Sequence, residues 1–262
     1  MEEGIAPTVL LQEEVTLHLF LELLQKRIIL KKSKKKGFNA PSFFSVYMVE
    51  GLNKFWSTPF RITKWKEFSL YAEEIISVIK QLEEVSTKET ESIEIAGLDQ
   101  GLTTKWYTYN FLSVENEAIS YLRNFITAEV RNYLQDIGQE ESNLYLQSWA
   151  NLLKNEEILK THSHAGPYSY ISGVFFVKTV ASSTRYFLPL DRRIPGVEDF
   201  YETEIEVKNM EGGLVIFPSF IEHCSTPTLK KLERMTIAFD VLKEAPIDRF
   251  HNGFGHKVID KF

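Results

Sequence analysis

Two histidines separated by a single residue, His162 and His164, are the first pair in the chain whose type and spacing suit metal chemistry. Side chains alternate faces along a strand, so both imidazoles would point the same way, roughly 6.5 Å apart along the chain. His223 follows the apolar run 214–217, which predicts a buried strand. Neutral imidazoles bind iron, zinc, copper or nickel, so the three histidines predict a metal site if distant strands meet. The alternative is that each is an ordinary, hydrogen-bonded structural residue.

The elements that must position these histidines change in character near residue 144. Helical spacing of apolar residues predicts helices over 12–30, 68–85 and 113–137, the last with Ser113 as N-cap and Gly138 after its end. Short runs rich in β-forming residues follow. They predict strands over 144–152, 158–164, 169–179, 184–188, 203–208, 214–218, 222–227 and 234–242. Gly212 and Gly213 predict the turn before the distal strand.

About eight short strands indicate a mainly β fold with a helical annex, a double-sheet jelly roll (double-stranded β-helix, cupin-like) with N-terminal helices packed on one sheet. We divide the chain into an N-terminal helical and aromatic extension (1–107), the β core with its preceding helix (108–243) and a C-terminal tail (244–262). His251 and His256 lie in this tail, where we expect solvent exposure or peripheral contacts.

Composition restricts the class of protein. A chain of 262 residues with 44% hydrophobic content can bury a sizeable core. The net charge of -6 argues against general binding to nucleic acid or anionic membranes, and the basic run 31–36 is interpreted as a solvated loop. The one cysteine, Cys224, excludes an internal disulfide and is expected to be a small packing residue. With no secretory signal or apolar span in view, a cytoplasmic location is expected.

Several pieces occur together in an order that resembles the 2-oxoglutarate and Fe(II)-dependent oxygenases, especially a group from bacteria and phages. The pieces are a tryptophan-containing strand (148–151), His162-Ser-His164, a Ser-Gly-aromatic strand (171–176), Gly213-Leu-Val-Ile-Phe-Pro-Ser219, His223 and the run 233–239. The resemblance extends from about residue 108 to residue 242. It implies Fe(II) as cofactor, 2-oxoglutarate and O₂ as cosubstrates, and hydroxylation of an unidentified substrate with release of succinate and CO₂.

The resemblance also implies roles for individual residues. His162 and His223 would be the first and the distal metal ligands, with no catalytic residue beyond the ligands. Arg234 would bind the remote carboxylate of 2-oxoglutarate, because its planar fork can donate two parallel hydrogen bonds, and Thr236 would add a third. The alternative for Arg234 is a surface ion pair with Glu233 or Glu206. Further candidates for cosubstrate or substrate contacts are Asn151, beside Trp149, and Tyr168, Tyr170 and Ser172.

One position departs from the wider superfamily, in which the second ligand is usually Asp or Glu. Here that position is His164. A neutral imidazole in place of a carboxylate leaves one more positive charge on the ferrous site and changes its redox tuning. Either His164 ligates, giving a three-histidine site, or it points away and two protein ligands remain.

Two other functions stay open on the sequence alone. One is a three-histidine, cupin-like metal enzyme that does not use 2-oxoglutarate. The other is a non-catalytic jelly roll that binds a ligand or serves a structural purpose. Dependence of turnover on 2-oxoglutarate separates the first from the oxygenase, and tight metal binding separates both enzymes from the third.

Overall fold

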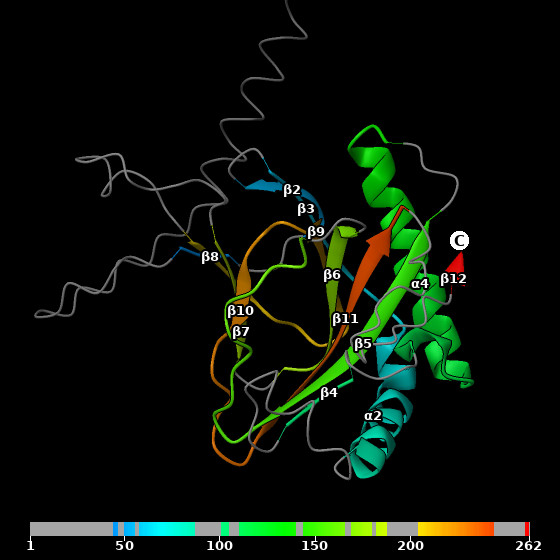
Figure 1. The fold of residues 1–262 in the computed structure, drawn as a ribbon, viewed down its shortest axis with the longest axis vertical. Helices are drawn as coiled ribbons and strands as arrows, with labels where there is room; N and C mark the ends of the chain where they lie inside the picture. Colours follow the sequence, from blue (N-terminus) through cyan, green and yellow to red (C-terminus); the bar gives the residue numbers. More distant parts are fainter. Residues whose placement is uncertain are drawn as a thin grey trace, which may run out of the picture. The chain divides into compact units, whose positions relative to one another are not determined.

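The computed structural model of the chain contains two β-sheets (Figure 1). Apolar side chains from both sheets pack together in one cluster. The structure describes residues 44–46, 50–55, 58–86, 101–104, 110–139, 144–165, 169–179, 182–187, 204–243 and 260–261. The larger sheet runs β12 (Asp260–Lys261), β5 (Tyr145–Lys154), β11 (Glu233–Leu242), β6 (Ser169–Lys178), β9 (Gly213–Pro218), β3 (Thr58–Lys64) and β2 (Gly51–Phe55), and β4 (Leu102–Thr103) pairs with β5. The smaller sheet runs β1 (Phe44–Val46), β8 (Glu204–Lys208), β7 (Ser183–Phe187) and β10 (His223–Ser225).

Alternation along β11 assigns its side chains to two faces of the larger sheet. Met235, Ile237 and Phe239 are fully buried in the core beneath the helices. Arg234 and Thr236 point to the opposite face, where a cavity lies. This follows from the two-residue period of a strand, and it places polar residues of β11 on the side that carries the histidines.

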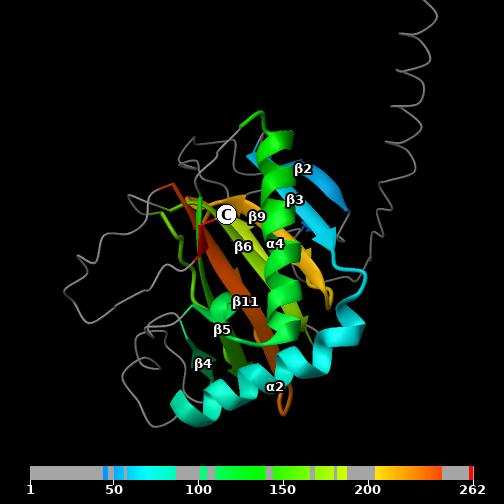
Figure 2. The same cartoon turned by 90° about the vertical axis from the view of Figure 1, so that its right-hand side faces the viewer.

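Two helices cover the other face of the larger sheet (Figure 2). They are α2 (Phe68–Ser86) and α4 (Glu117–Asp136), and the short 3-10 turn η1 (Phe111–Ser113) precedes the second. The N-cap of α4 is Asn116, whose side chain accepts from Ile119 N at 3.1 Å. The prediction of Ser113 as the cap is wrong, because Ser113 belongs to η1. Gly138, at φ 73°, ends the helix in the left-handed conformation that favours glycine.

The jelly-roll prediction is confirmed in its sheets and in most of its strands. The predicted strand 158–164 is wrong, since this segment is extended but forms only one isolated bridge, between His162 and His223. Part of its backbone bonds to side chains instead of to a neighbouring strand: Leu159 N donates to Ser225 Oγ at 2.8 Å. The backbone of residues 158–164 is therefore hydrogen-bonded through separate contacts and not through a continuous β-ladder.

All described elements belong to one compact unit, Phe43–Phe262. The division after residue 107 stays a prediction. β3, from the predicted extension, pairs with β9 of the predicted core from Arg61 opposite Ile216 to Lys64 opposite Gly213. The predicted helix 12–30, the basic run 31–36, His251 and His256 lie outside the described residues. None of the described helices is long and apolar enough to cross a membrane, and the cytoplasmic location stays a prediction.

Gly173 on β6 has no room for a side chain. A Cβ at this position would lie 2.2 Å from Phe239 Cζ, in the core beneath the helices. We expect Gly173→Ala to lower the free energy of unfolding by about 1 to 3 kcal/mol, the usual cost of overpacking a core. Urea unfolding followed by circular dichroism measures this change. An unchanged midpoint would mean that the ring of Phe239 can move aside without cost.

Candidate metal centre

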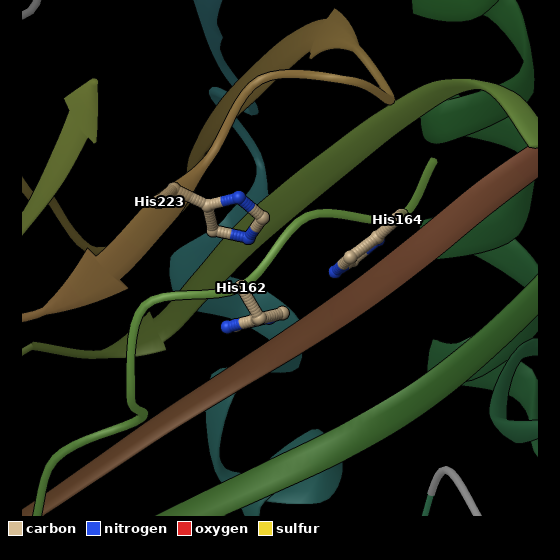
Figure 3. Close-up of side chains that lie close together, drawn as sticks. All are labelled: His162, His164 and His223. Atoms are coloured by element: carbon tan, nitrogen blue, oxygen red, sulfur yellow. The ribbon is translucent and has the colours of Figure 1, made fainter. Parts of the chain in front are cut away.

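Three histidines from two distant segments converge at one end of the small sheet. His162 and His164 lie in the extended segment after β5, and His223 begins β10. One ring nitrogen from each residue lies within 4.8 Å of the others, and Figure 3 shows the three imidazoles turned toward one another. The structure thus brings together all three histidines that the sequence singled out. His164 joins the cluster, and its role as a metal ligand stays a prediction.

Backbone pairing holds the two segments in register. His162 N donates to His223 O at 3.0 Å, and His223 N donates to His162 O at 2.9 Å. His164 N donates to Ser219 O at 2.9 Å, which ties the second histidine to the loop after β9. The ring of His223 also packs between Tyr186 and Phe217, at centroid distances of 5.8 and 5.0 Å. The cluster is therefore held by backbone hydrogen bonds and by ring packing around His223.

Each imidazole has an acceptor beside its Nδ1 atom. Nδ1 of His162 lies 2.6 Å from Lys160 O, and Nδ1 of His223 lies 3.1 Å from Ile221 O. Nδ1 of His164 lies 2.6 Å from Asp240 Oδ1. A carbonyl oxygen only accepts, so we infer that Nδ1 carries the proton in His162 and His223 and that Nε2 carries the lone pair. Metal-ligating histidines have this arrangement, in which the second ring nitrogen donates to a fixed partner.

His164 gives the sharpest test of whether the residues fit a metal. Its Nε2 atom is buried and has no hydrogen-bond partner in the protein. A buried polar atom without a partner is costly, and a lone pair directed at two other imidazole nitrogens is well suited to a transition metal. Among the described residues, this histidine group is the cluster whose donor set fits such an ion.

Arg234 lies in the same cavity and is 2% exposed. Its Nη2 donates to Thr184 Oγ1 at 3.2 Å, whereas Nε and Nη1 have no partner. Burial lowers the pKa of Arg234 to about 10, so the guanidinium still carries its charge at neutral pH. Thr236 Oγ1 is also buried without a partner. The site therefore offers a carboxylate a charged fork and a hydroxyl donor.

The surface ion pair considered for Arg234 is not present. Glu206 pairs with Arg185, with a nitrogen–oxygen distance of 3.3 Å. Glu233 accepts from Lys80 and lies 3.7 Å from Lys178 Nζ. Both carboxylates thus have other cations, and the guanidinium of Arg234 points into the interior.

The cavity has a volume of about 400 Å³. Its lining includes the three histidines, Arg234, Thr236, Trp149, Asn151, Thr184 and Cys224.

Ser172 does not line the cavity, because its hydroxyl lies behind the histidines, 2.6 Å from Asp240 Oδ1. Tyr168 lies outside the described residues. Cys224, expected to pack in a core, is half-buried at the cavity, and burial raises the pKa of its thiol.

Asp240 is the site residue that the sequence interpretation missed. Its carboxylate lies 2.6 Å from both His164 Nδ1 and Ser172 Oγ. A signal was present, because Arg234, Thr236 and Asp240 are separated by even numbers of residues on one strand and share a face. What the sequence lacked was the proximity of His164, 76 residues earlier.

Comparison with known proteins finds a family whose sequence profile matches the part of the chain that carries the site. The sequence profile of the family described as "Putative 2OG-Fe(II) oxygenase" matches residues 147–240, which contain all three histidines and Arg234. No curated protein matches the chain. The family name contains Fe(II) and 2-oxoglutarate, the cofactor and the cosubstrate that the sequence predicts.

Several solved structures are similar to the chain at low sequence identity. A prolyl hydroxylase from Trichoplax adhaerens, in complex with a peptide fragment of the hypoxia inducible factor oxygen degradation domain, is 9% identical and has a TM-score of 0.50 over 70% of this chain and 83% of that chain. A prolyl-4-hydroxylase from Pseudomonas putida is 14% identical, with a TM-score of 0.46 over 72% and 95% of the two chains. An oxidoreductase of the 2OG-Fe(II) oxygenase family from Burkholderia pseudomallei is 12% identical, with a TM-score of 0.38 over 50% of this chain and 59% of that chain.

The likeness to the Trichoplax adhaerens structure concerns the fold alone, and it agrees with the double-stranded β-helix described above. The profile match is independent of it and covers the strands that carry the cluster. Residues 147–240 of the chain are similar to the 2OG-Fe(II) oxygenase family.

Proposed function

We propose that the protein is an Fe(II)- and 2-oxoglutarate-dependent dioxygenase that hydroxylates a substrate still to be identified and releases succinate and CO₂. His162, His164 and His223 would hold the iron. Arg234 would bind the remote carboxylate of 2-oxoglutarate, with Thr236 as a further donor. The observation that carries the proposal is a buried guanidinium, two of whose nitrogens have no partner among the described residues, in the same cavity as three converging imidazoles.

The charge of Arg234 argues for an anionic ligand. Burying a cation costs free energy unless a counter-charge or hydrogen bonds compensate for it. Thr184 satisfies one nitrogen of the guanidinium, and two nitrogens stay without a partner. A carboxylate can accept two parallel hydrogen bonds from such a fork. A dicarboxylate could bind the metal with one carboxylate and accept hydrogen bonds from Arg234 with the other.

The residues around these groups would orient the cosubstrate and keep water out. Val174 and Ala238 present apolar surface to the cavity, and Trp149 packs against His164 with ring centroids 5.2 Å apart. Asn151 lines the cavity and offers an amide that can donate or accept. With iron and 2-oxoglutarate bound, the centre would supply oxidation of an unactivated C–H bond by O₂. Such an apolar lining strengthens the electrostatic contacts inside the cavity.

The two alternative functions require fewer of these residues. A three-histidine metal enzyme that does not use 2-oxoglutarate needs the histidines but gives no reason for a buried arginine without a counter-ion. A non-catalytic jelly roll needs neither feature. Arg234 therefore favours the oxygenase over both.

Calorimetric titrations under argon can separate the three functions without knowledge of the substrate. We expect the chain to bind Co(II), a redox-stable substitute for Fe(II), and then 2-oxoglutarate, with much weaker 2-oxoglutarate binding when the metal is absent. Metal binding without 2-oxoglutarate binding would support the cupin-like enzyme. If neither is bound, the oxygenase proposal is wrong.

Activity is then measured as succinate formation. Fe(II)-loaded protein is mixed with 2-oxoglutarate and air, with and without a panel of candidate substrates. We expect succinate to form only when metal, 2-oxoglutarate and O₂ are all present, at a higher rate with a true substrate. Hydroxylation itself is tested by a mass increase of one oxygen atom in the substrate.

A further inference from the structure

The carboxylate of Asp240 is held against the histidine cluster by donors from two elements. Its Oδ1 atom lies 2.6 Å from His164 Nδ1 and 2.6 Å from Ser172 Oγ. Ser172 lies on β6, directly opposite Asp240 in the β-ladder. Ser219 Oγ is 2.9 Å from Ser172 Oγ, so the serine that meets the carboxylate is itself fixed. The side chain of Asp240 is therefore positioned by the sheet.

Both contacts of Oδ1 are with groups that can donate, a ring N–H and a hydroxyl. A carboxylate that accepts them draws the Nδ1 proton of His164 toward itself and makes the other ring nitrogen a stronger electron donor. That other nitrogen is His164 Nε2, which is buried and without a partner. The carboxylate and the metal-facing lone pair thus lie at opposite ends of the same imidazole.

The net charge of the metal site depends on this arrangement of Asp240 and His164. A ferrous ion bound by two histidines and one carboxylate carries a net charge of +1, because the carboxylate offsets half of the metal charge. Three neutral imidazoles leave that charge at +2. With Asp240 hydrogen-bonded to His164, the group as a whole returns to +1. The negative charge is still present, but one residue further from the metal.

We propose that Asp240 is a positioning residue that supplies, through His164, the negative charge that a carboxylate ligand would otherwise give the metal. This inference rests on the proposed function, since it takes the histidine cluster as the metal site. It assigns Asp240 and Ser172 to one unit: Ser172 holds the carboxylate, and the carboxylate sets the tautomer and electron donation of His164. Ser172 would therefore act on the metal only through Asp240.

The variant that isolates charge from geometry is Asp240→Asn. The amide oxygen can still accept from both His164 and Ser172, so the contacts persist while the charge is lost. We expect its affinity for Co(II), titrated alone and followed by the visible absorption of bound Co(II), to fall about 10- to 100-fold, the usual effect of changes behind a metal ligand. Asp240→Glu, which keeps the charge, should recover part of this loss.

The matched control is Asp136→Asn, the same chemical change at a carboxylate that pairs with Arg61 Nη1 at 2.6 Å at the end of α4. It should leave Co(II) affinity unchanged. A double-mutant cycle adds a test that a purely structural role would fail. In a His164→Ala background, Asp240→Asn should cost no further affinity, because its effect passes through the imidazole that has been removed.

A measurement on the unmutated chain keeps the inference testable if Asp240 variants fold poorly. In the Zn(II)-loaded protein, the Nδ1 proton of His164 should resonate further downfield than those of His162 and His223, because it donates to a carboxylate and they donate to carbonyls. This signal should vanish in His164→Ala. The same chemical shift for all three protons would contradict the inference.

The outcomes separate this inference from the proposed function. If the unmutated chain binds no Co(II), the proposed function and the inference fall together. If Asp240→Asn binds Co(II) as tightly as the unmutated chain, or loses equal affinity with and without His164, the inference alone is overturned.

Discussion

Replacing His223 by alanine is expected to lower the affinity of the chain for Fe(II) by at least about 100-fold, because changes behind a ligand already cost 10- to 100-fold in metal proteins. His223 is 5% exposed, and its ring lies between those of Tyr186 and Phe217, so no neighbouring side chain can readily take its place. Affinity is measured by titration under argon with a competing chelator. The backbone bridge to His162 does not require the imidazole, so the fold should survive the change.

The controls are His251→Ala and His256→Ala, which remove imidazoles that the sequence places outside the motif. Both should retain iron at the level of the unmutated protein in elemental analysis. Equal iron retention in all three variants would contradict the histidine cluster as the metal site. Circular dichroism separates loss of a ligand from loss of the fold.

Replacing Arg234 by alanine should weaken 2-oxoglutarate binding at least about tenfold, since a hydrogen bond to a charged group contributes roughly 1.5 to 3 kcal/mol and a bidentate pair contributes more. Iron should stay bound, because Arg234 belongs to β11 and the histidines to other segments. Arg234→Lys should restore binding only in part, because lysine keeps the charge and loses the planar fork. The measurement is an anaerobic titration of the absorption that 2-oxoglutarate produces on binding Fe(II).

Arg131→Ala, at an exposed position on α4, is the matched control and should leave this titration unchanged. The same dissociation constant for Arg234→Ala and the unmutated protein would show that Arg234 is not the carboxylate anchor. If the unmutated protein developed no such absorption, the assignment of 2-oxoglutarate itself would be wrong. The lysine variant separates loss of charge from loss of geometry.

Features governed by local periodicity could be predicted from the sequence. The predicted helix over 68–85 is observed as Phe68–Ser86. The spacing of its apolar residues creates one face, and this face packs against the larger sheet. Gly138 ends α4 as expected, since glycine adopts positive φ without strain. Alternation also placed Arg234 and Thr236 on one face of β11, and both line the cavity. These features depend on residues close together in the chain.

The site itself was predictable only in part. The types of its candidate ligands and their order along the chain were apparent, because three histidines followed by an arginine in this order suit few purposes. The segment that carries His162 and His164 was wrongly predicted as a strand, because propensity does not report whether a partner strand lies alongside. Its partners are single groups, such as Ser225 Oγ, which bonds to Leu159 N. Such contacts arise only after the chain has folded.

Taken by itself, the sequence determined which side chains could bind a metal and a carboxylate, and which face of each strand they would share. Only the tertiary structure decided that His164 turns toward the other two histidines with Asp240 behind it, 76 residues away. It also decided that Arg234 is buried with no carboxylate partner among the described residues and meets Thr184 across 50 residues. The physical reason is that alternation and propensity act over a few residues, whereas pairing between distant strands determines which polar groups meet and which lose their contact with water.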